Sequence, residues 1–392
     1  MPKLSLKKLL SRIKDRKIGK GKTVLVAFSG GVDSSVATYI LKLQGYKVIA
    51  GFMKNWSDTK NELTGECSWR EERRMALRVA AKLNIPLKTF DFEKSYRKDV
   101  IDEMFLYYKN GLTPNPDVVC NQKIKFPLFW KEAKKLKADL MATGHYVRRL
   151  PEQGKSKEYK LLRAICEKKD QSYFLYRTTQ SELSHTLFPI GYYTKEEVRF
   201  MAKELEFHNY DKKGTKGICF IGKINLKDFL QQKIPPKKGR FVTPEGKIVG
   251  EHDGIMYYTI GQRIGPRFGM NIKKQPGKES GQRWYVAIKN VKKNEIIVAP
   301  EGHNVLLRKE IAVLKKNFHF INKKTHPKKV LARIRHVGEL LPSQIKYDKE
   351  KKIYLITLKQ AITGVAQGQS VVLYNKDEVI GGGEIVFPEM IK

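Results

Sequence analysis

Three residues stand where their neighbours could make them reactive. Cys120 precedes a predicted helix that starts near Gln122, and a thiol at a helix N-terminus has its pKa lowered by the helix dipole, which favours the nucleophilic thiolate. Asp117, three residues earlier, is placed to donate or accept a proton on the same substrate. Cys219 lies in the glycine-flanked segment 215–222 beside a lysine, a setting that suits a cysteine carrying transferable sulfur.

The chain has four cysteines in 392 residues and no C-x-x-C pair. This excludes a disulfide scaffold, argues against a structural zinc site and fits a reducing cytoplasm. Cys166 is interpreted as a buried small apolar residue, and Cys67 is open to the same interpretation. We therefore predict no protein-ligated structural metal.

A glycine-rich turn at residues 29–35, Ser-Gly-Gly-Val-Asp-Ser-Ser, follows the apolar run 24–28 and opens a predicted helix over 34–44. Two glycines let the backbone approach a phosphate closely, while successive N–H groups and the helix dipole attract its charge. Asp33 is placed near a Mg²⁺ ion that would accompany such a phosphate. A Walker A loop would need glycine at position 16, where the chain has Arg16. The G-x-G-x-x-G fingerprint is also absent, which argues against a dinucleotide-dependent oxidoreductase.

These groups need elements to position them, and the hydrophobic pattern supplies them. Strands are predicted at 24–28, 47–53, 87–91 and 139–143, and helices at 34–44, 68–84 (opened by a capping box from Ser68 to Glu71), from about 95, and at 122–136. Strands that alternate with helices predict a Rossmann-like, doubly wound parallel sheet of the α/β class. Past about residue 222, short alternating runs at 284–288, 296–299, 329–335, 353–358 and 370–374 predict a small central domain and a C-terminal β-barrel.

Charge indicates the kind of partner. Lysine and arginine number 77 against 40 acidic residues, a formal net charge of +37, which predicts a polyanion and first of all a nucleic acid. A basic host proteome would produce the same excess. No run approaches 18 uninterrupted apolar residues, so no membrane span is predicted. Residues 1–22 lack the apolar core of a secretory signal; their nine basic residues against Asp15 fit a nucleic-acid contact and a solvated tail equally.

The string Ser-Gly-Gly-Val-Asp-Ser resembles the PP-loop of ATP pyrophosphatases, enzymes that adenylate a substrate and release pyrophosphate. With the cysteine segments, the chain resembles tRNA-specific 2-thiouridylases from about Thr23 to Ile385. The motifs that carry this resemblance are 29–36, 51–56 (Gly-Phe-Met-Lys-Asn-Trp), 113–126, 142–146 (Ala-Thr-Gly-His-Tyr), 169–175 (Lys-Asp-Gln-Ser-Tyr-Phe-Leu), 217–222, 258–263, 368–370 and 381–383.

The resemblance implies roles for particular residues. It implies an ATP site at Ala27, Phe28, Ser29, Gly30, Gly31, Val32, Asp33, Ser34, Met53 and Gly144. It implies a target-base segment at Asn115, Pro116 and Asp117, a nucleophilic Cys120 and a persulfide-bearing Cys219. Further tRNA contacts are implied at His145, Lys169, Asp170, Gln171, Arg335, His336 and Gln369. The implied domains are a basic extension (1–22), a PP-loop catalytic domain (23–218), a central tRNA-binding domain (219–300) and a β-barrel domain (301–392).

The implied activity is ATP- and Mg²⁺-dependent 2-thiolation of the wobble uridine, on an anticodon stem-loop that is already single-stranded there. A cysteine desulfurase or a relay protein would supply sulfur to Cys219, and a Cys120–Cys219 disulfide would form during turnover. The chain departs from the family pattern in three places. Ala27-Phe28 stands where Gly-Met is usual, and His336 stands where a tyrosine is usual. The family's acidic residues after the position of Cys67 are partly replaced by Arg70, Arg73 and Arg74.

Two rival functions remain open from the sequence. A PP-loop enzyme with another acceptor, such as a lysidine-forming synthetase, would not depend on the cysteine pair. A non-catalytic RNA-binding protein built on the same fold would not release pyrophosphate, although Asp33, Asp117 and both cysteines are intact in this chain.

Overall fold

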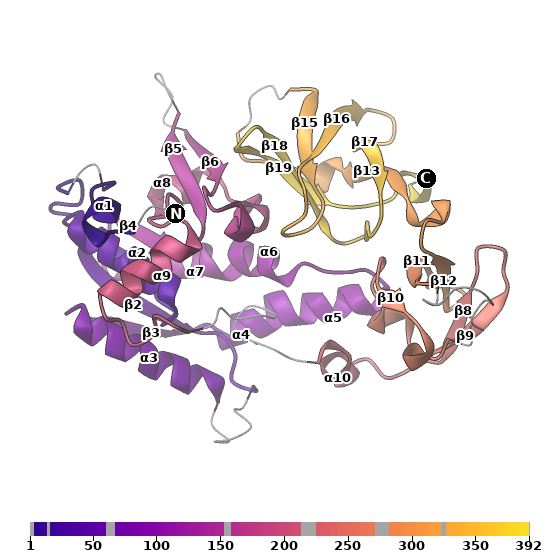
Figure 1. Ribbon diagram of the computed structural model, residues 1–392, viewed down its shortest axis with the longest axis horizontal. Helices are drawn as coiled ribbons and strands as arrows, with labels where there is room; N and C mark the ends of the chain where they lie inside the picture. Colours follow the sequence, from indigo (N-terminus) through magenta and orange to yellow (C-terminus); the bar gives the residue numbers. More distant parts are fainter. Residues whose placement is uncertain are drawn as a thin grey trace.

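The computed structural model describes residues 4–13, 16–59, 67–152, 158–212, 225–270, 282–322 and 327–391. Cys219 and its segment therefore lie outside the described residues. The molecule is elongated, with the N-terminal α/β region at one end, the strands β8–β12 at the other, and the C-terminal strands between them above α5 and α6 (Figure 1).

The first sheet is parallel throughout and has the order β3-β2-β1-β4-β7. Its strands are β1 (Thr23–Ala27), β2 (Lys47–Lys54), β3 (Leu87–Asp91), β4 (Leu140–Thr143) and β7 (Thr186–Leu187). One face packs against α1 (Leu6–Leu10), α2 (Val32–Leu43), α3 (Ser68–Lys82) and α9 (Lys195–Glu204), and the other against the helices of residues 93–135. Helices on both faces of a parallel sheet confirm the predicted doubly wound α/β fold.

The helices of residues 93–135 differ from the sequence prediction. They are α4 (Glu93–Tyr96), η1 (Arg97–Ile101), α5 (Asp102–Lys109), α6 (Pro116–Cys120), η2 (Asn121–Lys125) and α7 (Pro127–Lys135), and both η1 and η2 are π-helical. The helical run begins at Pro116, six residues before the predicted start, because a proline is well placed at a first helical position. The predicted capping box at Ser68 is also wrong, since Cys67 is the N-cap of α3 and caps no N–H with its side chain.

The central sheet has the order β10-β11-β12-β8-β9. Its strands are β8 (Gly239–Val242), β9 (Ile248–His252), β10 (Arg263–Ile264), β11 (Trp284–Asn290) and β12 (Glu295–Pro300), preceded by α10 (Leu226–Gln231). Phe241, Val286, Ile296 and Val298 are fully buried and form the centre of its core. The predicted small central domain is confirmed.

The C-terminal strands curl into a barrel. They are β13 (Arg308–Leu314), β14 (His319–Phe320), β15 (Lys329–Arg333), β16 (Leu341–Asp348), β17 (Ile353–Ile362), β18 (Ser370–Asn375) and β19 (Glu378–Glu384). Their order is β13-β17-β16-β15-β18-β19, and paired hydrogen bonds of 3.0 and 2.9 Å between Ala312 and Val386 join the first strand to the chain that follows the last. This closure confirms the predicted β-barrel.

The barrel sheet extends into the N-terminal half of the chain. The hairpin of β5 (Val147–Pro151) and β6 (Tyr159–Arg163) adds to β19, through a pairing of Leu162 with Glu378. The remaining helical elements are α8 (Gln180–His185) and the 3-10 turns η3 (Glu167–Lys169), η4 (Ser172–Leu175), η5 (Ile255–Tyr257), η6 (Pro266–Phe268), η7 (Asn304–Leu306), η8 (Lys315–Asn317) and η9 (Pro388–Met390). Among the described residues, no helix has both the length and the apolar character needed to cross a membrane.

Candidate active site

The carboxyl edge of the parallel sheet brings together the residues predicted to hold ATP. Ala27, the last residue of β1, pairs in register with Gly51 of β2 and Thr143 of β4. The loop 28–34, Met53 near the end of β2, and Gly144 after β4 therefore leave the sheet at the same edge. In open α/β sheets, ligands bind in the crevice beyond the carboxyl ends of the strands.

The glycine-rich turn is held in one shape by backbone approach and by hydroxyl groups. Gly30 has φ +69°, and a Cβ there would lie 2.8 Å from the Ala76 nitrogen and the Glu72 carbonyl oxygen of α3. Gly31 is the N-cap of the 12-residue helix α2, and its carbonyl accepts from the Ser34 and Ser35 hydroxyls at 3.1 and 2.9 Å. The N-terminus of α2 thus opens onto this turn, an arrangement that suits a bound phosphate.

Gly144 closes the same turn from the opposite strand. A Cβ at this position would lie 2.9 Å from the backbone nitrogen of Ser34 and 3.1 Å from the carbonyl carbon of Asp33. Any larger residue would push β4 and the turn apart, so the sequence requires glycine here.

Asp33 is held by Lys195, which no sequence motif indicated, and by Tyr146, the last residue of the motif 142–146. Its Oδ1 accepts from Lys195 Nζ at 2.6 Å and from the Tyr146 hydroxyl at 2.7 Å. Burial and the Asp33 carboxylate raise the pKa of Tyr146, so the phenol stays a donor. The sequence carried one signal for this region, since Thr194 and Glu197 have the spacing of a capping box that would start a helix at Lys195.

The described residues contain no cluster of three His, Cys, Asp or Glu side chains that could hold a metal ion. Lys195 and Tyr146 both donate to Oδ1 of Asp33, the carboxylate that the sequence predicts beside a Mg²⁺ ion.

Cys120 lies at the last residue of α6, five residues into a helical run, and not at a helix N-terminus. The predicted placement of Cys120 at a helix N-terminus is therefore wrong, and with it the reason for expecting a dipole effect, which acts within the first turn. Its side chain is only 1% exposed and belongs to the core under the sheet. Asp117 occupies the first turn of α6 instead, between Pro116 and Val118, and Asn115 caps that turn by accepting from the Val118 N–H at 3.4 Å.

His145 connects the carboxyl edge of the sheet with the helical run that carries Cys120. Its Nδ1 lies 2.8 Å from the Thr143 hydroxyl, and its Nε2 lies 3.3 Å from Lys125 Nζ in η2, one π-helical turn beyond Cys120. Because an ammonium can only donate, Nε2 accepts and Nδ1 carries the proton. Burial, and then the Lys125 charge, hold the pKa of His145 well below its usual range, so the ring is neutral.

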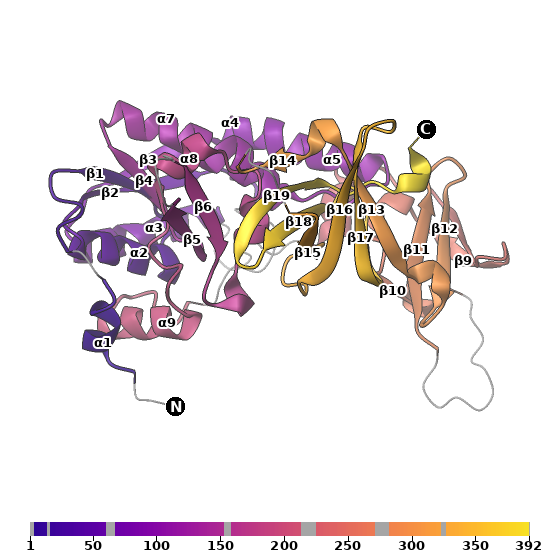
Figure 2. The ribbon, with the colours of Figure 1, turned by 90° about the horizontal axis from the view of Figure 1, so that it is seen from above.

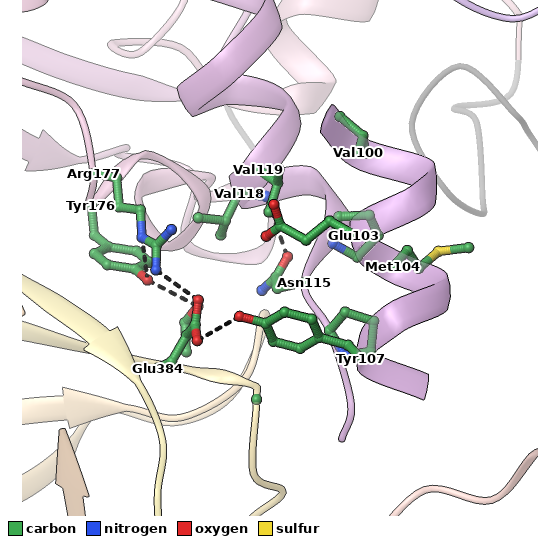
Figure 3. A pocket seen from close by; sticks show the side chains of 14 residues that line it. Val100, Glu103, Met104, Tyr107, Asn115, Val118, Val119, Tyr176, Arg177 and Glu384 are labelled. Carbon is green, nitrogen blue, oxygen red and sulfur yellow. Dashed lines mark hydrogen bonds and ion pairs between the residues drawn. The ribbon is translucent and has the colours of Figure 1, made fainter. Parts of the chain in front are cut away.

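A pocket lies between α6 and the barrel (Figure 3). Its walls come from η1 and α5, from the turn and helix 114–119, from residues 176–177 and from the barrel strands. Glu384 of β19 accepts from the Tyr107 hydroxyl at 2.7 Å and from Arg177 Nη2 at 2.9 Å, which ties three elements together at the pocket. Asn115, predicted to contact the target base, points into it (Figure 3).

Gln369 holds the chain at residues 113–114, just before α6, from the barrel side. Its Nε2 donates to the carbonyl oxygens of Thr113 and Pro114 at 3.3 and 2.9 Å. Gly368 approaches the turn so closely that a Cβ would lie 3.0 Å from the Thr113 carbonyl oxygen. The barrel therefore fixes the entry to α6.

The remaining predicted tRNA contacts divide into exposed and buried side chains. Lys169 and Arg335 are exposed, and His336 is half-buried with its ring centroid 4.3 Å from that of Phe174. Asp170 is 2% exposed and faces the protein interior. Gln171 accepts from the Tyr146 N–H at 2.9 Å, so it orients a partner of Asp33.

Comparisons with known proteins match this arrangement segment by segment. The tRNA methyl transferase HUP domain family matches residues 22–223, the tRNA methyl transferase PRC-barrel domain family matches 227–300, and the aminomethyltransferase beta-barrel domain family matches 308–385.

Full-length relatives cover all three segments, and they carry the name tRNA-specific 2-thiouridylase MnmA. The protein from Lysinibacillus sphaericus is 40% identical over 92% of this chain and 93% of its own length. The protein from Buchnera aphidicola is 42% identical over 94% of this chain and 98% of its own length. MnmA 1 from Geobacillus kaustophilus is 41% identical over 95% of this chain and 97% of its own length. On this similarity, over nearly its whole length, the chain belongs to the tRNA-specific 2-thiouridylase family.

Proposed function

We propose that this protein catalyses the ATP-dependent 2-thiolation of the wobble uridine of tRNA. The observation that supports this best is that a turn suited to a phosphate and Cys120 are held close together by the parallel sheet. The glycine-rich turn 29–35 follows β1, which pairs with β4. His145 contacts Thr143 of β4 and Lys125, which continues the helical run that carries Asp117 and Cys120. An activating nucleotide and a sulfur-handling cysteine need this kind of proximity if they act on the same base.

ATP would bind at the sheet edge, with residues 27–34, Met53 and Gly144 around it. The uridine C2 oxygen is a poor leaving group, so its attack on the α-phosphorus would convert it to an adenylate and expel pyrophosphate. Mg²⁺ bound with the phosphates would neutralise developing charge on the pyrophosphate. Within the chain, the N–H groups at the start of α2 and Lys195 supply the positive field for that step.

Sulfur would reach C2 from a persulfide on Cys219. The terminal sulfur attacks C2, the C2–O bond breaks and AMP leaves. Cys120 then attacks the Cys219 sulfur, which leaves the terminal sulfur on the base and forms a Cys120–Cys219 disulfide. In an alternative order, Cys120 frees the sulfur first and sulfide attacks C2. Either order ends with one disulfide, which an external two-electron reductant must reduce, and Asp117 would move the proton at the base.

The tRNA would lie across the face where the barrel meets α6. Asn115, Pro116 and Asp117 would contact the target base, and the exposed Lys169 and Arg335 would contact the phosphate backbone. His336 would contribute its half-buried ring, whereas His145, Asp170, Gln171 and Gln369 would act by shaping this face. We place the reaction in the cytoplasm, where a cysteine desulfurase or a relay protein would load Cys219.

Pyrophosphate release tests the proposal. It should require ATP and an unmodified tRNA together, whereas a non-catalytic RNA-binding protein would release none. Cys120→Ser and Cys219→Ser should each abolish formation of 2-thiouridine and keep tRNA affinity, while Cys166→Ser should stay active as a matched control. If pyrophosphate release proceeds and both serine variants still form product normally, the acceptor is not thiolated by this route.

A further inference from the structure

The N-terminal segment of residues 4–13 is a packed part of the catalytic region. It lies ahead of the family match, which begins at residue 22. Its helix α1 lies alongside α9 (Figure 2). Leu9 and Ile13 are 2% and 8% exposed and join the core formed by α2, α3 and α9. This burial excludes a solvated tail for the described segment.

An ion pair joins this segment to the start of α9. Arg12 donates through Nη2 and Nη1 to the two carboxylate oxygens of Glu197 at 2.7 and 3.0 Å. Glu197 is 9% exposed and also closes the capping box of α9 with Thr194, accepting from the Thr194 N–H at 2.8 Å. Arg12 therefore holds the side chain that defines where α9 begins, in the bidentate geometry that fixes orientation best.

Lys195 is the first residue of α9 and the next residue after the cap. Its Nζ donates to Asp33 Oδ1 at 2.6 Å, and its side chain is 13% exposed. The helix dipole disfavours a cation at this end of a helix. We explain a lysine at this position by its partner, because its ammonium faces Asp33 in the glycine-rich turn 29–35.

We propose that residues 4–13 act as a brace that positions Lys195, and that Lys195 binds the ATP phosphates. The path runs from Arg12 to Glu197, through the capped first turn of α9, and from Lys195 to Asp33. An ammonium has three N–H donors, so Lys195 can keep Asp33 and still donate to a phosphate oxygen. This inference rests on the proposed function insofar as ATP is the ligand of that turn.

The alternative is that the segment binds tRNA through its charge. Lys7 makes this distinction possible, because it is an exposed cation on α1, the helix that ends just before Arg12, and no described residue is recorded in an ion pair with it. Arg12→Ala and Lys7→Ala remove the same charge. If the segment acts as a brace, only Arg12→Ala should weaken ATP binding. If it acts through its charge alone, both variants should weaken tRNA binding equally, and the loss should depend strongly on salt.

The experiment titrates ATP into the full-length protein by calorimetry without tRNA, and measures KM and kcat for ATP and tRNA in parallel. Arg12→Ala should raise the ATP dissociation constant and KM about fivefold, with little change in kcat or in KM for tRNA. The ATP dissociation constant of Arg12→Lys should lie between those of Arg12→Ala and the unchanged protein, because lysine keeps the charge but cannot form the bidentate hydrogen bonds of arginine. Lys195→Ala should raise the ATP dissociation constant about 100-fold, the loss expected for a hydrogen bond to a charged group. Adding Arg12→Ala to Lys195→Ala should weaken binding no further, because the two residues act in series.

An effect of Arg12→Ala confined to thermal stability and kcat, with ATP affinity unchanged, would overturn the brace. So would equal losses of ATP affinity for Arg12→Ala and Lys7→Ala, or full additivity in the double variant. Direct ATP binding separates this result from the proposed function. If ATP affinity follows the expected pattern and no 2-thiouridine forms, the brace stands and the thiolation fails.

Discussion

Asp170 and Arg333 form a buried ion pair between the N-terminal half of the chain and the barrel. Asp170 Oδ2 accepts from Arg333 Nη1 at 2.6 Å, and the two side chains are 0% and 6% exposed. The same carboxylate also accepts from the Ala164 N–H and from the Ser172 N–H and hydroxyl. Asp170 therefore has a structural role that its resemblance-based assignment as a tRNA contact did not include.

Asp170→Asn should lower the free energy of unfolding by about 3 kcal/mol, because it leaves the Arg333 charge buried without a counter-charge. Urea unfolding measures this loss. Its neighbour Lys169 is exposed, so Lys169→Ala should leave the unfolding midpoint unchanged and weaken tRNA binding in a salt-dependent way. The structural role would be contradicted if Asp170→Asn unfolded at the normal urea concentration and lost only tRNA affinity.

Gln369→Ala should reduce kcat/KM for tRNA while the ATP dissociation constant stays the same. The substitution leaves the Thr113 and Pro114 carbonyls without this donor, and a lost hydrogen bond of this kind costs about 1 kcal/mol, or about a fivefold effect. Steady-state kinetics with each substrate varied in turn checks this. A change in ATP affinity as large as that in kcat/KM for tRNA would show that the turn also serves the nucleotide site.

Cys120 should react slowly with iodoacetamide in the protein alone, because its side chain is 1% exposed. Binding of ATP and tRNA should raise its rate if the thiol must reach the base during turnover. Peptide mass spectrometry measures modification of Cys120 separately from that of the partly exposed Cys67, which serves as the internal control. Fast, substrate-independent labelling of Cys120 would contradict the buried resting position.

Stability should fall as the pH drops below about 6.5, the pKa of an unperturbed histidine. Burial, with Lys134 and Arg149 nearby, lowers the pKa of His185 to about 4, so between these two pH values the unfolded chain binds a proton that the folded chain does not. The stabilisation is thus present above pH 6.5 and is lost toward pH 4, by at most about 1.4 kcal/mol per pH unit.

His185→Phe tests this prediction, because a phenyl ring can keep the stacking on Trp130, where the ring centroids are 3.9 Å apart, without titrating. Denaturant unfolding measured from pH 7 to pH 4 should show a shallower loss in the variant. Parallel pH profiles for the two proteins would contradict the assignment.

The sequence predicted the sheet and the turn at 29–35 because both depend on local patterns, namely apolar strands followed by glycine and helix starts. It could not predict Lys195 at Asp33, because 162 residues separate them and only the parallel sheet brings them together. It misplaced Cys120 because the π-helical turn 121–125 continues a helix that Pro116 had already begun, and apolar periodicity does not report such a turn. It also could not show that Asp170 is buried, since its partner Arg333 lies in the barrel.

Nucleoside mass spectrometry of tRNA tests the central claim most directly. Unmodified tRNA would be incubated with the protein, ATP, Mg²⁺ and a persulfide-generating cysteine desulfurase, then digested to nucleosides to identify the product and, in parallel, to oligonucleotides to locate it. We predict 2-thiouridine at the wobble position only, with one AMP formed for each sulfur atom inserted. The Cys219→Ser variant should form no 2-thiouridine. If the protein consumed ATP in the presence of tRNA, and that uridine gained no sulfur, the proposed reaction would be contradicted.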